Sequence, residues 1–127
     1  NAVTQVAQDL NSGNQNFTGN SSFRIFREIA AVTLTKTGAT VQLGGKFMAR
    51  SHNDQCLCQF RLKRGSTILF TSQTFSVRPS PEGIHVPIGF IDTSGTTGSV
   101  TYKLEAGLND EQQNYNDAFL FALETKR

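Results

Sequence analysis

Apolar and polar residues alternate with a period of two along most of this chain. Between Gly98 and Leu108, one set of alternate positions is apolar: Val100, Tyr102, Leu104, Ala106 and Leu108. This period is the signature of a β-strand with one buried and one solvated face. The same alternation marks residues 41–50, 56–62 and 84–92, and residues 118–125 place large apolar groups on both sides. The pattern predicts an all-β protein.

Turn and breaker residues separate the predicted strands. Lys36-Thr37-Gly38 has the composition of a turn, and the two prolines of residues 78–83 indicate a rigid loop. Gly44-Gly45, in the middle of a strand, indicates a bulge or a close backbone approach. Pro87 has no amide hydrogen, so its strand is expected at a sheet edge or with a bulge.

Two polar segments show no clear strand pattern. Residues 1–22 are rich in Asn, Gln, Ser and Gly, and we expect a polar lead-in or linker there. Residues 23–127 then form a single domain. The nearly all-polar residues 109–117 are expected to form a loop before the last strand.

About eight short strands without a convincing helix predict an antiparallel β-sandwich. Double-sheet jelly rolls and immunoglobulin-like sandwiches both fit this strand number. No Cys…Trp…Cys signature favours the immunoglobulin choice, because the chain has no Trp. Its ten Phe residues are scattered over the strands and suit a sandwich interior.

Composition narrows the class of partner. The net charge is only +2, whereas nucleic-acid-binding proteins usually carry a basic stripe or patch, so we expect no nucleic-acid binding. No apolar run approaches the ~18 residues that a membrane-spanning helix needs, so we expect no membrane insertion. The chain begins with Asn and shows no leader pattern, and we expect a processed product or a domain of a longer protein.

The chain carries no recognisable catalytic or metal-binding motif. Cys56 and Cys58, at i and i+2 of a strand, lie too far apart for an easy disulfide and are read as small buried residues. His52 and His85 stand apart from any nucleophile, and the pair Asp110-Glu111 offers too few oxygens for calcium. We therefore predict a protein that is not an enzyme, with no catalytic residues, no cofactor and no metal.

The polar loop is the best candidate for binding a partner. It combines amides and a carboxylate with one aromatic residue, and the candidate residues are Asn109, Asp110, Gln112, Gln113, Asn114, Tyr115 and Asn116. Such a set suits sugar hydroxyls or another protein, with Tyr115 as the anchor. The alternative is a solvated linker with Tyr115 folded back on the sandwich. Arg61, Lys63 and Arg64 form a basic corner, which we read as solvated surface.

Three segments together resemble a known group of modules. They are Gly44–Arg50 with Cys56–Ile68, then Val86–Leu104, and finally Leu120–Arg127. They resemble the tumour-necrosis-factor-like jelly-roll modules of bacteriophage and other virion spike, fibre and capsid-decorating proteins. The similarity extends over roughly residues 39–127, and its motifs are strand and turn patterns.

The resemblance implies a jelly roll of about eight strands that forms trimers through aromatic and aliphatic faces. Our first hypothesis is therefore a homotrimeric domain at the virion surface, acting in assembly or host attachment through other virion proteins, a host receptor or a glycan. A carbohydrate-binding sandwich and a secreted cytokine-like trimeric ligand are the alternatives. The candidate residues for the subunit interface are Phe23, Phe26, Tyr102, Phe119 and Phe121.

Overall fold

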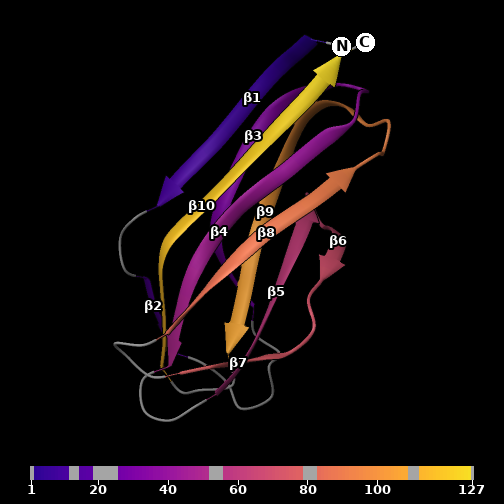
Figure 1. Cartoon of the computed structure of the whole chain (residues 1–127). Coiled ribbons are helices and arrows are strands. Elements are labelled where there is room, and N and C mark those ends of the chain that lie inside the picture. The colour runs from indigo at the N-terminus through magenta and orange to yellow at the C-terminus, as the bar shows by residue number, and fades with distance from the viewer. Residues whose placement is uncertain are drawn as a thin grey trace.

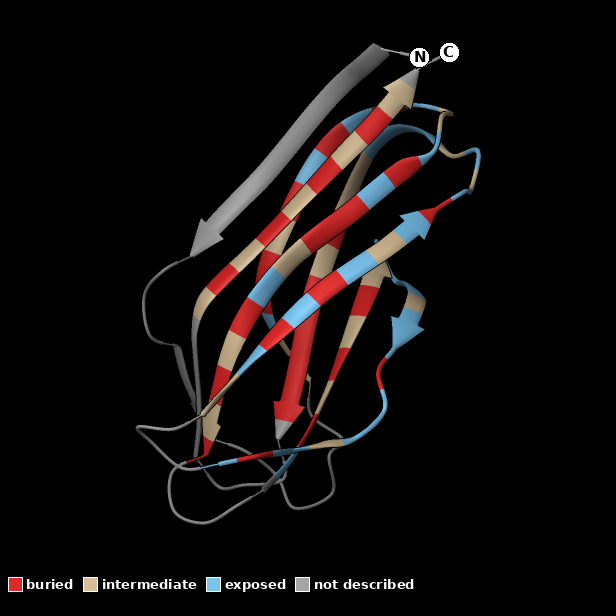
Figure 2. Ribbon diagram, in the orientation of Figure 1, coloured by how far each residue is buried: buried red, intermediate tan, exposed pale blue. Residues whose placement is uncertain are grey.

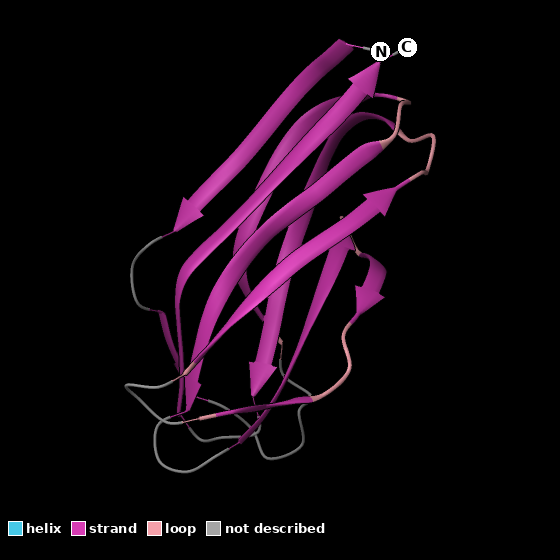
Figure 3. Cartoon of the chain, in the orientation of Figure 1, coloured by secondary structure: helices cyan, strands magenta, loops and turns pink. Residues whose placement is uncertain are grey.

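The computed structural model describes the backbone of residues 2–11, 15–18, 26–51, 56–78, 83–108 and 112–126. It describes the side chains of residues 26–51, 57–78, 83–107 and 117–125. Every regular element among the described residues is a strand (Figure 3). The ten strands are β1 (Ala2–Asn11), β2 (Gln15–Thr18), β3 (Arg27–Thr37), β4 (Val41–Ser51), β5 (Cys56–Arg64), β6 (Thr67–Thr71), β7 (Phe75–Val77), β8 (Ile84–Asp92), β9 (Thr97–Leu108) and β10 (Gln112–Lys126).

The strands form two antiparallel sheets that pack face to face (Figure 1). Sheet A has the order β1-β10-β4-β8, and β2 pairs with β10 beyond the end of β1. Sheet B has the order β3-β9-β5-β6, and β7 pairs with β5 beyond the end of β6. Counting β1 with β2 and β6 with β7 leaves eight strand positions, four in each sheet. This is a jelly-roll sandwich, and the predicted fold class is confirmed.

Residues 1–22 do not form the expected linker where the structure describes them. Strand β1 pairs with β10 from Ala2↔Lys126 to Asn11↔Ala118, and β2 continues along the same strand. In Figure 1 the two termini accordingly lie together at the top. A strand can join a sheet through its backbone hydrogen bonds alone. The Asn- and Gln-rich sequence of β1 and β2 therefore did not indicate that these residues form strands.

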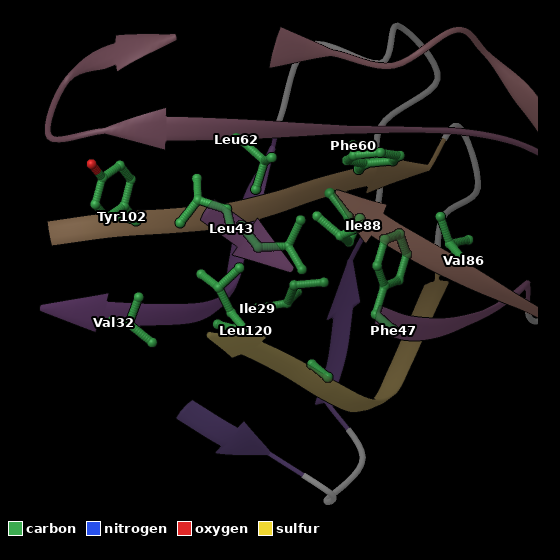
Figure 4. Packing of buried hydrophobic residues seen from close by; sticks show 14 of the residues in the cluster. Ile29, Val32, Leu43, Phe47, Phe60, Leu62, Val86, Ile88, Tyr102 and Leu120 are labelled. Atoms are coloured by element: carbon green, nitrogen blue, oxygen red, sulfur yellow. The ribbon is translucent and has the colours of Figure 1, made fainter. Parts of the chain in front are cut away.

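The core lies between the sheets and follows the predicted alternation. Buried and exposed positions alternate along the strands of both sheets (Figure 2). Side chains such as Leu43, Phe47 and Leu120 of sheet A meet Ile29, Leu62 and Leu104 of sheet B; Figure 4 shows most of them. Cys58 is buried among them, as expected for a small apolar residue.

The prolines and glycines act as their positions suggested. Strand β8, which carries Pro87, pairs only with β4 and forms an edge of sheet A, so the edge prediction is confirmed. Gly44 and Gly45 permit a close approach to β10, while the bulge lies in β10 next to them, between Asn116 and Phe119 and opposite Lys46 and Met48. That bulge contains Asp117, which has a positive φ of 55°.

Candidate functional site

Most of the predicted polar loop is part of a strand. Asn109 and Asp110 lie outside the described residues, but Gln112, Gln113, Asn114, Tyr115 and Asn116 belong to β10. Tyr115 pairs with Gln15 of β2 on one side and with Ala49 of β4 on the other. The loop prediction is therefore wrong for this part. Strands β2 and β4 pair with the backbone of β10 from either side, and the polar side chains give no sign of this pairing in the sequence. The side chains of residues 112–116 lie outside the described ones, and their role in binding stays a prediction.

The five predicted interface residues separate into different environments. Phe23 lies outside the described residues. Phe26 is half-buried, and its ring centroid lies 4.2 Å from Cζ of Arg61. Tyr102 is completely buried between the sheets, with its hydroxyl 2.6 Å from Oδ2 of Asp92. Tyr102 is therefore a core residue and offers no surface to a partner, which corrects its assignment to the interface.

Phe119 and Phe121 do lie together on the outer face of sheet A. Along β10, the half-buried Phe119, Phe121 and Leu123 alternate with the buried Leu120 and Ala122. The two ring centroids are 5.7 Å apart. We call Phe119, Phe121 and Leu123 the face patch.

Across the outer face of sheet A, the rows that begin at the face patch contain glycines and Ile91, together with the exposed polar residues Gln42 and Lys46. The register places Phe121, Gly44 and Gly89 in one row across β10, β4 and β8. The next row is Leu123, Gln42 and Ile91, in which Ile91 is 59% exposed. The Phe121 ring lies against Gly44, while nothing lies within 4 Å of a Cβ placed on Gly89. Gly89 therefore leaves an open position on this face, whereas the ring of Phe121 covers Gly44.

The outer face of sheet B has the opposite character. Glu105 of β9 accepts from Arg61 Nε at 2.5 Å and lies 3.6 Å from Lys63 Nζ. Lys103 and Glu28 form a more exposed pair at 3.9 Å. Two members of the predicted basic corner, Arg61 and Lys63, thus share the carboxylate of Glu105. The charged side chains of these pairs find their partners within the chain.

A second group of charges is buried at the end of the sandwich where β3, β5 and β8 end. Asp92 of sheet A accepts from Tyr102 Oη at 2.6 Å, from Arg64 Nη1 at 2.9 Å and from the Ser94 amide at 3.1 Å. The fully buried Lys36 Nζ lies 3.8 Å from Asp92 Oδ2. Lys36 also donates to the Ser94 carbonyl at 3.1 Å and to Thr96 Oγ1 at 2.9 Å. We call Lys36, Arg64, Asp92 and Tyr102 the charge cluster.

The charge cluster joins the two sheets. Its one carboxylate comes from β8 of sheet A, and the three groups around it come from β3, β5 and β9 of sheet B. Burial alone would raise the pKa of Asp92, but hydrogen bonds from Tyr102, Ser94 and Arg64 outweigh it and lower that pKa. Burial, and then the hydrogen bond to Asp92, raise the pKa of the Tyr102 phenol well above its usual value. The arrangement holds a carboxylate and a neutral phenol in place, which suits a structural tie.

We expect the charge cluster to make stability depend on pH at both extremes. Because the pKa of Asp92 is lowered on folding, its contribution is present above the unfolded pKa of about 3.9 and is lost as the pH falls through the folded pKa. Because the pKa of Tyr102 is raised, its contribution is present below about pH 10 and is lost as the pH rises further. Denaturant titrations across both ranges measure these losses.

The variant Tyr102→Phe tests the alkaline half of this expectation. Without the phenol, the part of the stability loss that Tyr102 causes above about pH 10 should disappear. If Tyr102→Phe loses as much stability above about pH 10 as the parent chain does, then folding does not raise the pKa of Tyr102 as expected.

Other chemistry is sparse in the described part of the chain. No three His, Cys, Asp or Glu side chains gather there in a way that would hold a metal ion. Within the same residues, no helix is long and apolar enough to cross a membrane. Sequence reasoning missed the charge cluster, since its members are separated by 28 residues or more except for Asp92 and Tyr102. The one available signal was a carboxylate, Asp92, at an inward position of a predicted strand.

Comparisons with known proteins support the fold. No protein-family model matches the sequence, and no curated protein is similar to it in sequence. Among solved structures, the Gx strain of infectious bursal disease virus matches with a TM-score of 0.70 at 11% identity, over 94% of this chain and 32% of the viral one. The VP2 subviral particle of infectious bursal disease virus matches with a TM-score of 0.60 at 12% identity, over 94% and 32% of the two chains.

A bacterial protein shares the fold as well. Dimeric latent PorU from Porphyromonas gingivalis matches with a TM-score of 0.55 at 13% identity, over 97% of this chain and 13% of the other. Matches to a tumour necrosis factor and to two carbohydrate-binding modules have TM-scores of only 0.44 to 0.49, too low to establish a shared fold. The chain spans about a third of the viral chains, and identities this low establish a shared jelly-roll fold alone.

Proposed function

We propose that this chain is a non-enzymatic structural domain of a virion, which forms a homotrimer and acts in assembly or host attachment. The observation that carries the proposal is the contrast between the two outer faces of the sandwich. Sheet A presents the face patch and Ile91, whereas sheet B presents residues that are paired with one another. The fold shared with a capsid protein of infectious bursal disease virus supports the same conclusion.

The contrast favours sheet A as the face that meets other copies. Burying an apolar surface is favourable at roughly 25 cal/mol per Å². Covering sheet B would instead remove water from the ion pairs that Glu105 forms with Arg61 and Lys63, at a desolvation cost. Association through sheet A gains apolar burial and desolvates fewer charges, because Lys46 is the one charged residue among those of β4 that lie opposite the face patch.

The proposed setting is a virion surface, where the trimer contacts other virion proteins and a host receptor or glycan. The side chains of Asn109, Asp110 and residues 112–116 remain candidates for those contacts. The face contrast supports association through surface packing.

Replacing Ile91 with lysine tests the proposal. The side chain of Ile91 is 59% exposed on the chain itself, so Ile91→Lys is expected to leave folding intact. In a trimer that buries sheet A, the lysine charge would be desolvated, and the trimer should dissociate to monomers at micromolar concentration. Sedimentation equilibrium measures the mass of the particle.

Leu57→Lys is the matched control. Leu57 is 39% exposed on β5 of sheet B, away from the face patch, and its replacement should leave the trimer intact. A monomeric parent chain at micromolar concentration would overturn the trimer. A trimer that survives Ile91→Lys but dissociates in Leu57→Lys would show that sheet B is the contact face.

A further inference from the structure

We propose that Lys36 and Asp92 react with each other to form an intramolecular amide bond, which joins the two sheets covalently. The bond links Nζ of Lys36 to Cγ of Asp92 and releases one water molecule. It forms within a single copy of the chain, so the inference is independent of the proposed trimer and of its setting. The reaction happens once in each chain, which agrees with a domain that is not an enzyme.

The two reacting groups are held beside each other and away from water. The side chain of Lys36 is fully buried, that of Asp92 is 4% exposed, and Nζ lies 3.8 Å from Oδ2. The two residues come from β3 and β8 in opposite sheets, and both strands end at the top of the sandwich in Figure 1. Holding two reactants together in this way removes most of the entropic cost of bringing them into contact.

Two oxygen atoms next to Asp92 position the amine of Lys36. Nζ donates to the carbonyl oxygen of Ser94 at 3.1 Å and to Oγ1 of Thr96 at 2.9 Å. Both residues lie in the segment that directly follows Asp92 in the sequence. The amine is therefore held against the same segment that carries the carboxyl group, which keeps Nζ within reach of Cγ.

The two oxygens of the Asp92 carboxylate have different partners. Oδ1 accepts from Arg64 Nη1 at 2.9 Å and from the Ser94 amide at 3.1 Å. When an amine attacks Cγ, negative charge develops on the oxygen that stays, and fixed donors of this kind stabilise it. Oδ1 is thus suited to become the amide oxygen. Oδ2, which faces Lys36 and accepts from Tyr102 Oη at 2.6 Å, is suited to leave as water.

The reaction balances without any further reactant. It starts from the ammonium of Lys36 and the carboxylate of Asp92, and two protons pass from Nζ to Oδ2. Tyr102 relays one of them by giving its own proton to Oδ2 and recovering another. Nζ then bonds to Cγ, the bond between Cγ and Oδ2 breaks, and Oδ2 departs as water. The product is a neutral amide with one proton on its nitrogen, and Tyr102 is unchanged.

Burial favours the amide over the ion pair. Two charges that are taken out of water carry a desolvation penalty, which their attraction offsets only in part. Amide formation removes both charges from the interior. Arg64 keeps an acceptor in the amide oxygen, and its side chain, 19% exposed, also reaches water. Once the amide has formed, Asp92 no longer titrates, so the loss of stability at acid pH belongs to the unreacted chain.

The mass of the denatured chain tests the proposal directly. After folding, the parent chain is expected to be lighter than its sequence by the mass of one water molecule. Trypsin does not cleave after an acylated lysine, so residues 28–46 and 65–103 should be recovered as one branched peptide. Mass spectrometry measures both. A folded parent chain with the full mass of its sequence would overturn the proposal.

Two lysine variants locate the bond. Lys36→Arg keeps the positive charge but replaces the amine with a much weaker nucleophile, so this variant should have the full mass of its sequence. Lys103 lies 3.9 Å from Glu28, nearly the same separation, but on the exposed outer face of sheet B. Lys103→Arg should therefore still lack one water. The opposite result, with the full mass in Lys103→Arg alone, would place the bond at the exposed pair and overturn the proposal.

Tyr102→Phe tests the proton relay. The variant keeps the aromatic ring in the core and removes the proton donor to Oδ2, so the bond should form roughly 100- to 10,000-fold more slowly, as expected for the loss of a positioned acid. The mass of freshly refolded protein, followed over time, gives the two rates. Equal rates in Tyr102→Phe and the parent chain would overturn the role assigned to Tyr102, while the branched peptide would still establish the bond.

Discussion

Asp92→Ala is expected to lower the free energy of unfolding by about 3–5 kcal/mol, the usual cost of breaking a buried ion pair from one side. Removing this carboxylate leaves Arg64 and the fully buried Lys36 without their counter-ion, and leaves the Tyr102 hydroxyl without its acceptor. The loss is large because the remaining cations stay away from water. Urea or guanidinium titration measures it.

Glu28→Ala is the control for Asp92→Ala. It also deletes one carboxylate from an ion pair, but Glu28 and Lys103 lie on the exposed face of sheet B, 3.9 Å apart. Exposed pairs of this kind contribute about 0–1 kcal/mol. Equal losses for the two variants would contradict the view that burial, rather than pairing itself, makes the charge cluster important.

The alternation of apolar and polar residues was sufficient to predict the fold class. In β9 the predicted inward positions Tyr102, Leu104 and Ala106 are all completely buried. The edge position of β8 followed from one residue, Pro87, because a missing amide hydrogen has a direct consequence in a sheet. These predictions succeeded because each depends only on residues that are close in sequence: the alternation along β9 and the missing amide hydrogen of Pro87.

The remaining features depend on contacts between distant segments. Strands β1 and β2, and the first part of β10, are held by backbone pairing that their Asn- and Gln-rich sequences do not reveal. Tyr102 occupies an inward position, but its role as donor to Asp92 depends on how β8 and β9 are placed in opposite sheets. The contact between Phe70 and Phe90 likewise arises only when β6 and β8 meet across the sandwich.

The charge cluster and the apolar residues at the edge formed by β6 and β8 are linked through the placement of the two sheets. This edge combines Ile68 and Phe70 of sheet B with Phe90 and Ile91 of sheet A. The charge cluster holds Asp92, next to Ile91, to Arg64 near the start of β6. A buried tie at this end therefore fixes the two halves of the edge relative to each other.

Gly45→Ala is expected to destabilise the fold by about 3 kcal/mol, at the upper end of the usual cost of overpacking. A Cβ on Gly45 would overlap the carbonyl oxygen of Phe119, and would lie 2.9 Å from its carbonyl carbon and 3.1 Å from Cα of Leu120. All three atoms are backbone atoms of β10, so no side-chain rotation relieves the clash. Either β4 and β10 separate, or their hydrogen bonds are distorted next to the bulge.

Gly89→Ala supplies the matched comparison for Gly45→Ala, since Gly89 lies in the same sheet, one row away. Nothing lies within 4 Å of a Cβ on Gly89, and the change should be neutral or stabilise the fold by up to about 0.5 kcal/mol. At Gly44 the three atoms nearest to the added Cβ all belong to the ring of Phe121, which can move, so Gly44→Ala should cost less than Gly45→Ala. Thermal or denaturant unfolding of the three variants gives the order. A Gly45→Ala variant as stable as Gly89→Ala would contradict the close approach of β4 to β10, and with it the position of Phe119 and Phe121 on the proposed contact face.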